Sequence, residues 1–187
     1  RSGIGKITRF DPAPYETQIA GEVHDFDATK YMDRKDARRT DRFTHFAVAA
    51  ASQALADAKL ETVADPERVG TAIATGVGGL ETLIREVILM EERGPSRLSP
   101  FLVPMLMANA ASAQCSMQFG LKGPSLTHVS ACASSSHAIG ESGEIIRRGQ
   151  ADVMVTGGSE AAVLPLAIGA FSTMHAMSRR NHDPEHA

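Results

Sequence analysis

Residues 69–75, with the sequence VGTAIAT, form an apolar run that carries no charged side chain. An Asp-Pro pair at residues 65–66 precedes the run, and four residues rich in glycine, 76–79, follow it. A short apolar run between such breakers is typical of a strand that is buried on both faces. Because strands of this kind belong to parallel sheets covered by helices, the run favours an α/β fold.

Helical and extended patterns alternate through the rest of the chain. Alternation of this kind indicates a mainly parallel sheet with helices packed on it. We therefore predict one α/β domain over residues 1–187. The expected helices are residues 39–59, 80–93, 104–119 and a segment that begins after residue 132 and ends near residue 148, and the expected strands are residues 69–75, 125–131 and 152–156.

The composition excludes several classes of protein. The formal charge of −3 gives no reason to expect a nucleic-acid partner. No apolar run reaches the length of a membrane span, and the longest, residues 161–171, is interrupted by Pro165 and Gly169. The only two cysteines are Cys115 and Cys132, so a disulfide framework is not expected and the cytoplasm is the expected location.

Neither end of the chain resembles the end of a complete parallel-sheet domain. Residues 1–14 are loop-like with no strand before them, and residues 178–187 are a polar tail with no element after it. We therefore expect the chain to be a piece of a longer protein, truncated at both ends.

Cys132 is the residue with the clearest chemical significance. It follows the extended run 125–131 and precedes the small residues 133–140, which lead into a helix. A cysteine at such a junction lies at the positive end of the helix dipole, beside backbone N–H groups without helical partners. Both favour the nucleophilic thiolate, and the same N–H groups can bind the oxyanion that forms when a thioester is attacked. On position alone, a role as a small buried hydrophobic residue is an equal alternative.

Several ordered motifs resemble those of the β-ketoacyl synthases. Residues 123–137 (GPSLTHVSACASSSH) are similar to the active-site segment of that family, and residues 149–160 (GQADVMVTGGSE) to the strand that follows the nucleophile helix. Residues 75–79, 99–104 and 171–181 resemble further family motifs in the family's order. The resemblance extends from near Phe26 to the last residue and is greatest to the elongation enzymes of type II fatty acid synthesis.

The resemblance implies a thiolase-like layered αβαβα fold. Each half of that fold is an α/β unit, and this chain would be most of the N-terminal, nucleophile-bearing half without its first strand. It also implies a homodimer in which residues 125–131 pair with the same strand of a second copy. An isolated chain would leave that strand as an exposed edge.

The resemblance further implies an acyltransferase that carries out a decarboxylative Claisen condensation. Cys132 would accept an acyl chain as a thioester, with its own backbone N–H as one oxyanion donor. The substrates would arrive on the phosphopantetheine arm of acyl-carrier protein, so no separate cofactor is expected. Malonyl-carrier protein would then lose CO₂, and its carbanion would attack the thioester to extend the acyl chain as a β-ketoacyl product.

Part of that machinery is expected to be missing from this chain. The family decarboxylates malonyl groups with two histidines and a lysine of its C-terminal half, and no histidine here stands in a family His-Gly-Thr or Asn-His-Phe-Gly setting. His137 would lie roughly 140° around a helix from Cys132, which favours an ordinary helix histidine. His128 precedes the cysteine on the expected strand and shares its face at best distantly. We therefore expect the chain alone to be inactive.

Two residues match the family's acyl pocket. Val77 stands where the family has a gating residue, usually isoleucine, and Phe171 matches a phenylalanine that lines the same pocket. A plain turn role for Val77 and ordinary core packing for Phe171 are the alternatives.

Basic residues are candidates for the contact with the carrier protein. Carrier proteins of this pathway are strongly acidic, and opposite charges steer such partners together. The candidates are Arg38, Arg39 and Arg97, with Arg34 and Lys35 beside them. For Arg34 and Lys35 a solvated helix face is an equal alternative.

Other functions stay open or are disfavoured. A polyketide synthase ketosynthase is one alternative, although such domains usually place two serines directly after the cysteine, where Ala133 stands here. A non-catalytic subunit that sets chain length is another, but such subunits lose the nucleophile and Cys132 is present. Thiolases surround their cysteine differently, and residues 157–161 (GGSEA) lack the closing glycine of a serine hydrolase elbow.

The remaining candidate residues carry less information. No spacing of metal ligands occurs, and residues 76–79 are not a dinucleotide fingerprint. Cys115, inside an expected helix, is interpreted as structural. Glu160, which follows a double glycine, is interpreted as a buried polar anchor without an assigned role.

Overall fold

The computed structural model describes residues 2–60 and 62–187. The chain divides into two compact units. Residues 28–161 form the larger one, here termed the sheet unit, and residues 2–27 together with 162–187 form the smaller one, the terminal unit.

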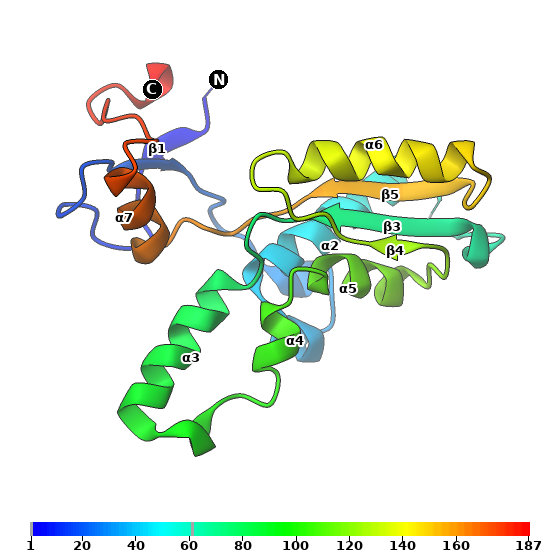
Figure 1. Ribbon diagram of the computed structural model, residues 1–187, viewed down its shortest axis with the longest axis horizontal. Helices are drawn as coiled ribbons and strands as arrows, with labels where there is room; N and C mark the ends of the chain where they lie inside the picture. The colour runs from blue at the N-terminus through cyan, green and yellow to red at the C-terminus, as the bar shows by residue number, and fades with distance from the viewer. Residues whose placement is uncertain (1, 61) are drawn as a thin grey trace. The chain divides into compact units, whose positions relative to one another are not determined.

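The sheet unit is built on three parallel strands (Figure 1). The central strand, β3 (Val69–Ala74), pairs along its whole length with β5 (Val153–Gly158) and over two residues with β4 (Ser125–Leu126). All six residues of β3 are buried. The apolar run of the sequence is therefore a strand buried on both faces, as predicted.

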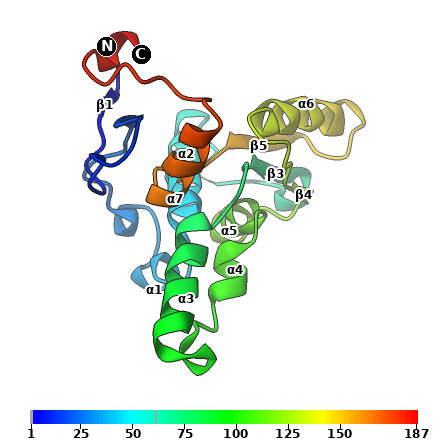
Figure 2. The same cartoon turned by 60° about the vertical axis from the view of Figure 1, so that its left-hand side comes forward.

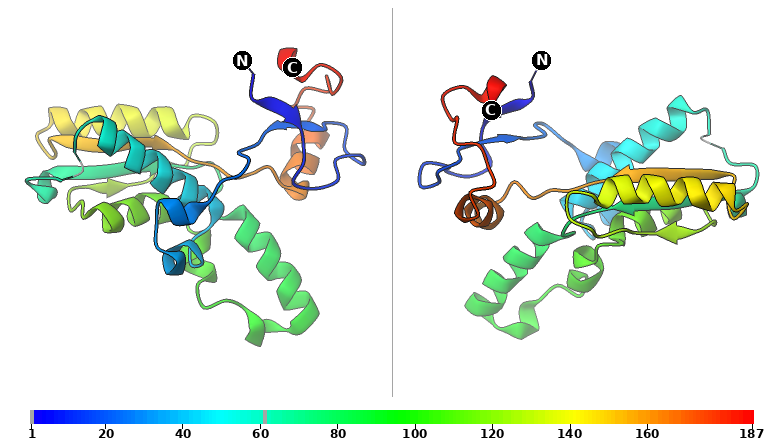
Figure 3. Two further views of the ribbon diagram at one scale, coloured as in Figure 1. Left: turned by 180° about the vertical axis from the view of Figure 1, so that it is seen from behind. Right: turned by 45° about the horizontal axis from the view of Figure 1, so that its top comes forward.

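Helices cover both faces of this sheet (Figures 1 and 3). α2 (Arg42–Asp57) and α5 (Ala110–Phe119) pack against each other on one face, and α6 (Ser134–Arg147) packs on the other. The α/β class and the order of the main elements are thus confirmed. The remaining elements of this unit are η1 (Ala28–Lys30), α1 (Arg34–Ala37), η2 (Pro66–Arg68), α3 (Leu80–Arg93), η3 (Pro95–Arg97) and α4 (Leu102–Leu106).

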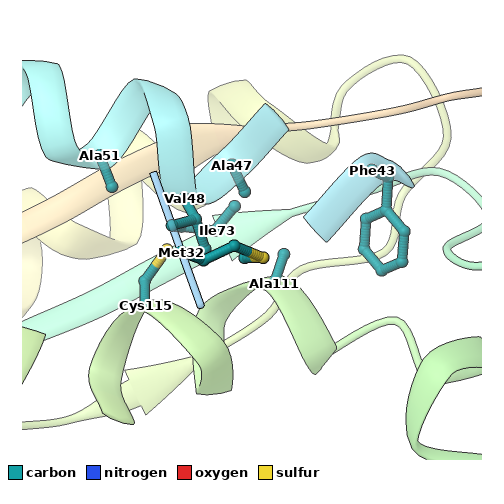
Figure 4. Close-up of a cluster of buried hydrophobic side chains, with 8 residues drawn as sticks. All are labelled: Met32, Phe43, Ala47, Val48, Ala51, Ile73, Ala111 and Cys115. Carbon is teal, nitrogen blue, oxygen red and sulfur yellow. The ribbon is translucent and has the colours of Figure 1, made fainter. Parts of the chain in front are cut away.

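The side chains of β3 alternate between two cores, as the period of a strand requires. Ile73 packs with residues of α2 and α5, among them the buried Cys115 (Figure 4). Ala72 and Ala74 face the opposite way and pack with Ala138 of α6. Because these three residues are small, α6 lies close to the sheet, and its first turn is held near the ends of the strands.

α3 and α4 pack against each other (Figure 2), and a buried carboxylate joins the start of α3 to the start of α2. Asp41, the N-cap of α2, accepts hydrogen bonds from the N–H of Phe43 at 3.3 Å and from the N–H and hydroxyl of Thr82 at 2.9 and 2.6 Å. Asp41 is 3% exposed and Thr82 is 1% exposed. This carboxylate therefore satisfies donors at two helix N-termini and fixes how α3 leaves the sheet.

Two of the predicted helices differ from the observed ones. The helix predicted over residues 104–119 is two helices, α4 and α5, because the backbone at Met107 leaves the helical region with ψ at 134°. The helix predicted over residues 39–59 begins only at Arg42, where Asp41 caps it. Residues 39–42 (RTDR) carry no apolar side chain and include Asp41, a typical N-cap residue, so the sequence did contain a signal for the later start of α2.

The strand predicted over residues 125–131 is regular only at β4. Beyond Leu126 the chain still follows the end of β3, since the N–H of Thr75 donates to the carbonyl of His128 at 3.4 Å. It then bends towards Cys132, and regular pairing ends because the chain must turn into α6. The β-rich composition therefore predicted the direction of this segment but overstated its length as a strand.

The terminal unit contains a two-stranded antiparallel sheet and one longer helix. β1 (Ile4–Lys6) pairs with β2 (Ile19–Gly21), so the loop predicted over residues 1–14 is wrong at β1. The apolar run near the C-terminus forms α7 (Pro165–Thr173), and η4 (Pro184–His186) follows. Within the described residues, no helix combines the length and the apolar character needed to cross a bilayer.

Asn181 joins the two chain segments of the terminal unit. Its side-chain oxygen accepts from the N–H of Gln18 at 2.8 Å, and its amide donates to the carbonyl of Glu16 at 2.8 Å. The hydroxyl of Thr17 also donates to the carbonyl of Ser178 at 3.0 Å. Residues far apart in the sequence thereby form one compact unit.

Replacing Asp41 tests its role at the two helix starts. Asp41→Ala should lower the free energy of unfolding by about 3 kcal/mol, because the buried donors at Phe43 and Thr82 lose their acceptor. Asp41→Asn keeps one acceptor oxygen and should lose less. Guanidinium denaturation followed by circular dichroism measures the difference. Asp57→Ala, at the exposed end of α2, is the control and should change stability by under about 0.5 kcal/mol; equal losses in the two alanine variants would refute the role of Asp41.

Candidate functional site

The chain segments that follow β3, β4 and β5 meet at the carboxyl ends of these parallel strands. The segment after β4 lies beside the end of β3, through the hydrogen bond between Thr75 and His128. It brings the carbonyl oxygen of Ala131 to 4.0 Å from the position that a Cβ on Gly76 would occupy. In open α/β sheets ligands bind at this edge, so the turns found here are the candidate functional site.

Cys132 lies in a tight turn directly before α6. The carbonyl of Ser130 accepts a hydrogen bond from the N–H of Ala133 at 3.1 Å, which closes the turn around Ala131 and Cys132. Ala131 has a φ of 51°, in the left-handed region that residues with a Cβ rarely occupy. Such a conformation persists only where the surrounding structure holds it.

Ser134 supplies that support. It is 3% exposed, and its hydroxyl accepts from the N–H of Ser130 at 2.8 Å and donates to the carbonyl of Ala131 at 2.6 Å. One buried hydroxyl therefore uses both its donor and its acceptor to hold the two sides of the turn. In the sequence Ser134 is only one of the small residues that follow the cysteine, and this role could not be predicted because the pattern does not show where a hydroxyl points.

The first turn of α6 is pressed against the end of β5. A Cβ at Gly158 would lie 1.8 Å from the hydroxyl of Ser135. Only a glycine lets the strand pass so close to the helix start. The start of α6 is therefore held close to the end of β5 at Ser135 and Gly158.

The thiol of Cys132 is exposed, and α6 begins two residues after it. The helix is 14 residues long, so its N-terminal end carries a positive partial charge and N–H groups without helical partners. A thiolate in this position can attack an acyl carbonyl, and the N–H groups can stabilise the oxyanion. An exposed cysteine does not fit the alternative of a buried hydrophobic residue.

Cys115 differs from Cys132 in its exposure to solvent. It is fully buried in the core between α2, α5 and β3 (Figure 4). Burial raises the pKa of its thiol to about 12, so it stays neutral at physiological pH. The structural interpretation of Cys115 is therefore confirmed.

The two histidines near Cys132 make different contacts. Nδ1 of His137 lies 2.6 Å from the hydroxyl of Ser130, so this side chain contributes to the turn, in accord with its interpretation as an ordinary helix histidine. Nδ1 of His128 is buried and has no hydrogen-bond partner within the described part of the chain. Neither histidine is shown to contact the thiol.

Val77 lies in the turn that follows β3, and 53% of its surface is exposed. Its N–H and that of Gly76 donate to the same carboxylate oxygen of Glu160, at 3.0 and 2.8 Å. The sequence predicts a buried polar anchor at Glu160; the residue does anchor this turn, but it is exposed rather than buried. It follows β5, which pairs with β3, so the strand pairing brings it to the turn.

Phe171 is the second residue assigned to the acyl pocket. It lies in α7 of the terminal unit and is 45% exposed, whereas Val77 and Cys132 belong to the sheet unit. The pocket shared by Phe171 and Val77 stays a prediction.

The basic residues lie near the starts of α2 and α4. Arg38 and Arg39 follow α1, and the guanidinium carbon of Arg39 lies 4.4 Å from the ring centroid of Phe101. Arg38 also lines a cavity of about 390 Å³ together with Arg42 and Arg85. Arg97, in η3, is exposed. Their contact with a carrier protein stays a prediction.

No cluster of His, Cys, Asp and Glu within residues 2–60 and 62–187 has the arrangement of a metal site.

Comparisons with known proteins agree with this geometry. A family model described as "Beta-ketoacyl synthase, N-terminal domain" matches residues 1–187. The chain is 47% identical over 188 residues to the 3-oxoacyl-[acyl-carrier-protein] synthase 2 of Synechocystis sp., which covers 100% of this chain and 45% of that protein.

Two solved structures are similar to the chain. A β-ketoacyl synthase from Burkholderia phymatum is 29% identical with a TM-score of 0.85, over 98% of this chain and 46% of that one. A ketosynthase in complex with its type II polyketide acyl-carrier protein and bound to the hexaketide is 28% identical with a TM-score of 0.77, over 81% and 44%. The chain thus spans less than half the length of each of these relatives.

The two cysteines should be distinguished by alkylation. In the folded chain iodoacetamide should modify Cys132 and leave Cys115 unmodified up to about pH 9, because Cys115 is buried and its pKa is raised to about 12. Intact mass should show one adduct in buffer and two in guanidinium, and peptide mapping identifies the site. Cys132→Ala should show no adduct while folded; modification of Cys115 in that variant would show that its burial is wrong.

Removing the hydroxyl of Ser134 should destabilise the turn. Ser134→Ala should lower the free energy of unfolding by about 2 kcal/mol, because the N–H of Ser130 loses its buried acceptor and Ala131 loses part of the support for its left-handed backbone. Ser136→Ala, at an exposed position of the same helix, is the matched control. Denaturant midpoints that coincide in the two variants would show that Ser134 does not hold the turn.

Proposed function

The chain belongs to the β-ketoacyl synthase family, with the family's thiolase-like α/β fold, and we propose that it carries the nucleophile of a 3-oxoacyl-[acyl-carrier-protein] synthase. The proposed enzyme is an acyltransferase of fatty acid elongation. The observation that supports this most directly is the exposed Cys132 in a strained turn at the N-terminus of α6.

The first step is acyl transfer to Cys132. Sγ, as thiolate, attacks the carbonyl carbon of an acyl thioester, and the electron pair of the carbonyl moves to oxygen. When the tetrahedral intermediate collapses, the bond to the donor sulfur breaks and the donor leaves as a thiolate that takes up a proton. The backbone N–H groups around Cys132 at the start of α6 stabilise the oxyanion in this scheme, and the helix dipole favours the attacking thiolate.

The condensation step also needs groups that decarboxylate the malonyl unit, and we propose that this chain does not supply them. The carbanion formed when malonyl-carrier protein loses CO₂ attacks the Cys132 thioester, and Sγ leaves as thiolate. His137 does not fit the role of a decarboxylation group, since its Nδ1 is turned to the hydroxyl of Ser130. The chain covers 45% of its Synechocystis relative, so we propose that the decarboxylation groups lie outside this sequence and that the chain alone does not condense.

A fatty acid pathway is favoured over a polyketide pathway. The chain is 47% identical to a 3-oxoacyl-carrier-protein synthase and 28% identical to the polyketide ketosynthase. The polyketide alternative is supported by the similar fold of that ketosynthase. A non-catalytic chain-length subunit is disfavoured because Cys132 is present and exposed.

The proposed partner is acyl-carrier protein, whose phosphopantetheine arm would bring the substrates without any separate cofactor. The similar polyketide ketosynthase was solved in complex with its carrier protein. The side chains of Arg38, Arg39 and Arg97 are exposed and would attract an acidic partner. We assign the carrier contact to these three residues, and the wall of the acyl pocket to Val77 and Phe171.

A second copy of the chain is the other proposed partner. Within the described residues β4 pairs with β3 and is one of the two edge strands of the three-stranded sheet. Leu126 is 39% exposed and Val129 is 58% exposed, so residues 125–131 present apolar side chains along this edge. We propose a homodimer through this segment, in the cytoplasm, where the thiol of Cys132 stays reduced.

Acyl transfer to Cys132 can be tested directly by intact mass. Incubation with an acyl-carrier-protein thioester should add one acyl group to the chain and to Cys115→Ala, and none to Cys132→Ala. Addition of malonyl-carrier protein should leave the adduct unchanged, because decarboxylation groups are absent. A folded chain that stays unmodified, or an adduct that survives in Cys132→Ala, would be evidence against the proposed nucleophile.

A further inference from the structure

One oxygen of Glu160 holds the whole turn that carries Val77. Oε2 accepts hydrogen bonds from the N–H of Gly76 at 2.8 Å, the N–H of Val77 at 3.0 Å and the hydroxyl of Thr75 at 3.1 Å. The same hydroxyl of Thr75 accepts from the N–H of Gly78 at 3.2 Å. A negatively charged acceptor makes stronger hydrogen bonds than a neutral one, so this carboxylate is the main polar contact of the turn.

The backbone that presents Glu160 is itself fixed. The N–H of Ser159 donates to the carbonyl of Ala74 at 2.9 Å, and its hydroxyl donates to the carbonyl of Phe43 at 2.6 Å. These contacts tie the residue before Glu160 to the end of β3 and to the start of α2. The carboxylate therefore acts from a rigid position, although its own side chain is exposed.

The opposite side of the turn is fixed by α4. The N–H of Gly79 donates to the carbonyl of Leu106 at 3.2 Å, and a Cβ at Gly79 would lie 2.2 Å from the carbonyl oxygen of Met105. Gly78 has a φ of 92°, which favours glycine. The turn is thus held at one end by close backbone packing and at the other by Glu160.

Val77 itself is 53% exposed. With about half of the residue open to solvent, the direction of its side chain depends strongly on the backbone of the turn. Gly76 leaves room for the carboxylate, since a Cβ there would lie 3.0 Å from Oε2 of Glu160. The position of that Cβ also lies 4.0 Å from the carbonyl oxygen of Ala131, the residue before Cys132. A movement of the turn would therefore displace atoms beside the nucleophile.

From these contacts we propose that Glu160 is a positioning residue that fixes Val77 at the acyl pocket and so determines which acyl chains reach Cys132. The inference rests on the proposed function, in which Val77 lines that pocket. It assigns to Glu160 no contact with the substrate: Glu160 acts through the backbone of residues 75–77.

The test compares a short and a long acyl donor. Hexanoyl- and hexadecanoyl-carrier-protein thioesters compete for Cys132, and intact mass gives the ratio of the two adducts. Glu160→Ala should change this ratio by about tenfold, because the turn loses its charged acceptor. Glu160→Gln keeps an acceptor oxygen and should give a smaller change. Glu92→Ala, at an exposed position of α3, is the matched control and should leave the ratio unchanged.

A double variant separates positioning from a general structural effect. Val77→Ala should change the ratio by itself, and Glu160→Ala should add nothing further in that background, because Glu160 acts only through Val77. If the double variant instead changes the adduct ratio by the product of the two single fold-changes, the two residues act independently and the inference is wrong. An adduct ratio that Glu160→Ala leaves unaltered would also overturn it.

Amide hydrogen exchange gives a readout that needs no acylation. In Glu160→Ala the amides of Gly76 and Val77 should exchange at least about tenfold faster than in the parent chain, while the amides of β3 stay protected. Unchanged exchange at those two amides overturns the inference whatever the acylation result. If the parent chain accepts no acyl group although the amides respond as expected, the proposed function fails and the link between Glu160 and acyl selectivity falls with it.

Discussion

Burial of β3 between two layers of helices is the constraint on which the rest of the sheet unit depends. Its alternating side chains contribute to a core with α2 and α5 on one face and to a core with α6 on the other. Because β3 is central and parallel to both neighbours, the three strands end at the same edge of the sheet. The turn of Val77, the turn of Cys132 and the side chain of Glu160 are therefore brought together by the sheet itself.

Side-chain hydrogen bonds, rather than apolar packing, then fix the details of this edge. The hydroxyl of Ser134 holds a turn in which Ala131 has a left-handed backbone, and the carboxylate of Glu160 holds the turn of Val77. Both turns carry an exposed side chain that the proposed chemistry needs. Polar contacts to the backbone allow such a side chain to be well placed and still accessible to a substrate.

The two cysteines show how surroundings decide the chemistry of one residue type. Cys115 lies in the core, where burial raises the pKa of its thiol to about 12. Cys132 is exposed at the N-terminal end of a helix, where the dipole favours a negative charge. The sequence separated them correctly because one lies within a helical pattern and the other at the junction of an extended run and a helix.

The sequence by itself determined the α/β class, the buried strand at residues 69–75, the helix over residues 80–93 and the position of Cys132 before a helix. These features depend on apolar periodicity, on glycine and proline breakers and on the motif around Cys132, all of which involve residues close together in the chain. It did not determine the break at Met107, the shortness of β4 or the left-handed backbone of Ala131. At these points tertiary packing overrides the backbone conformation that the local sequence favours. Nor did it reveal the contact of Glu160 with Gly76, 84 positions away in the chain. Only the pairing of β5 with β3 makes those residues neighbours, so that contact was decided by the tertiary structure alone.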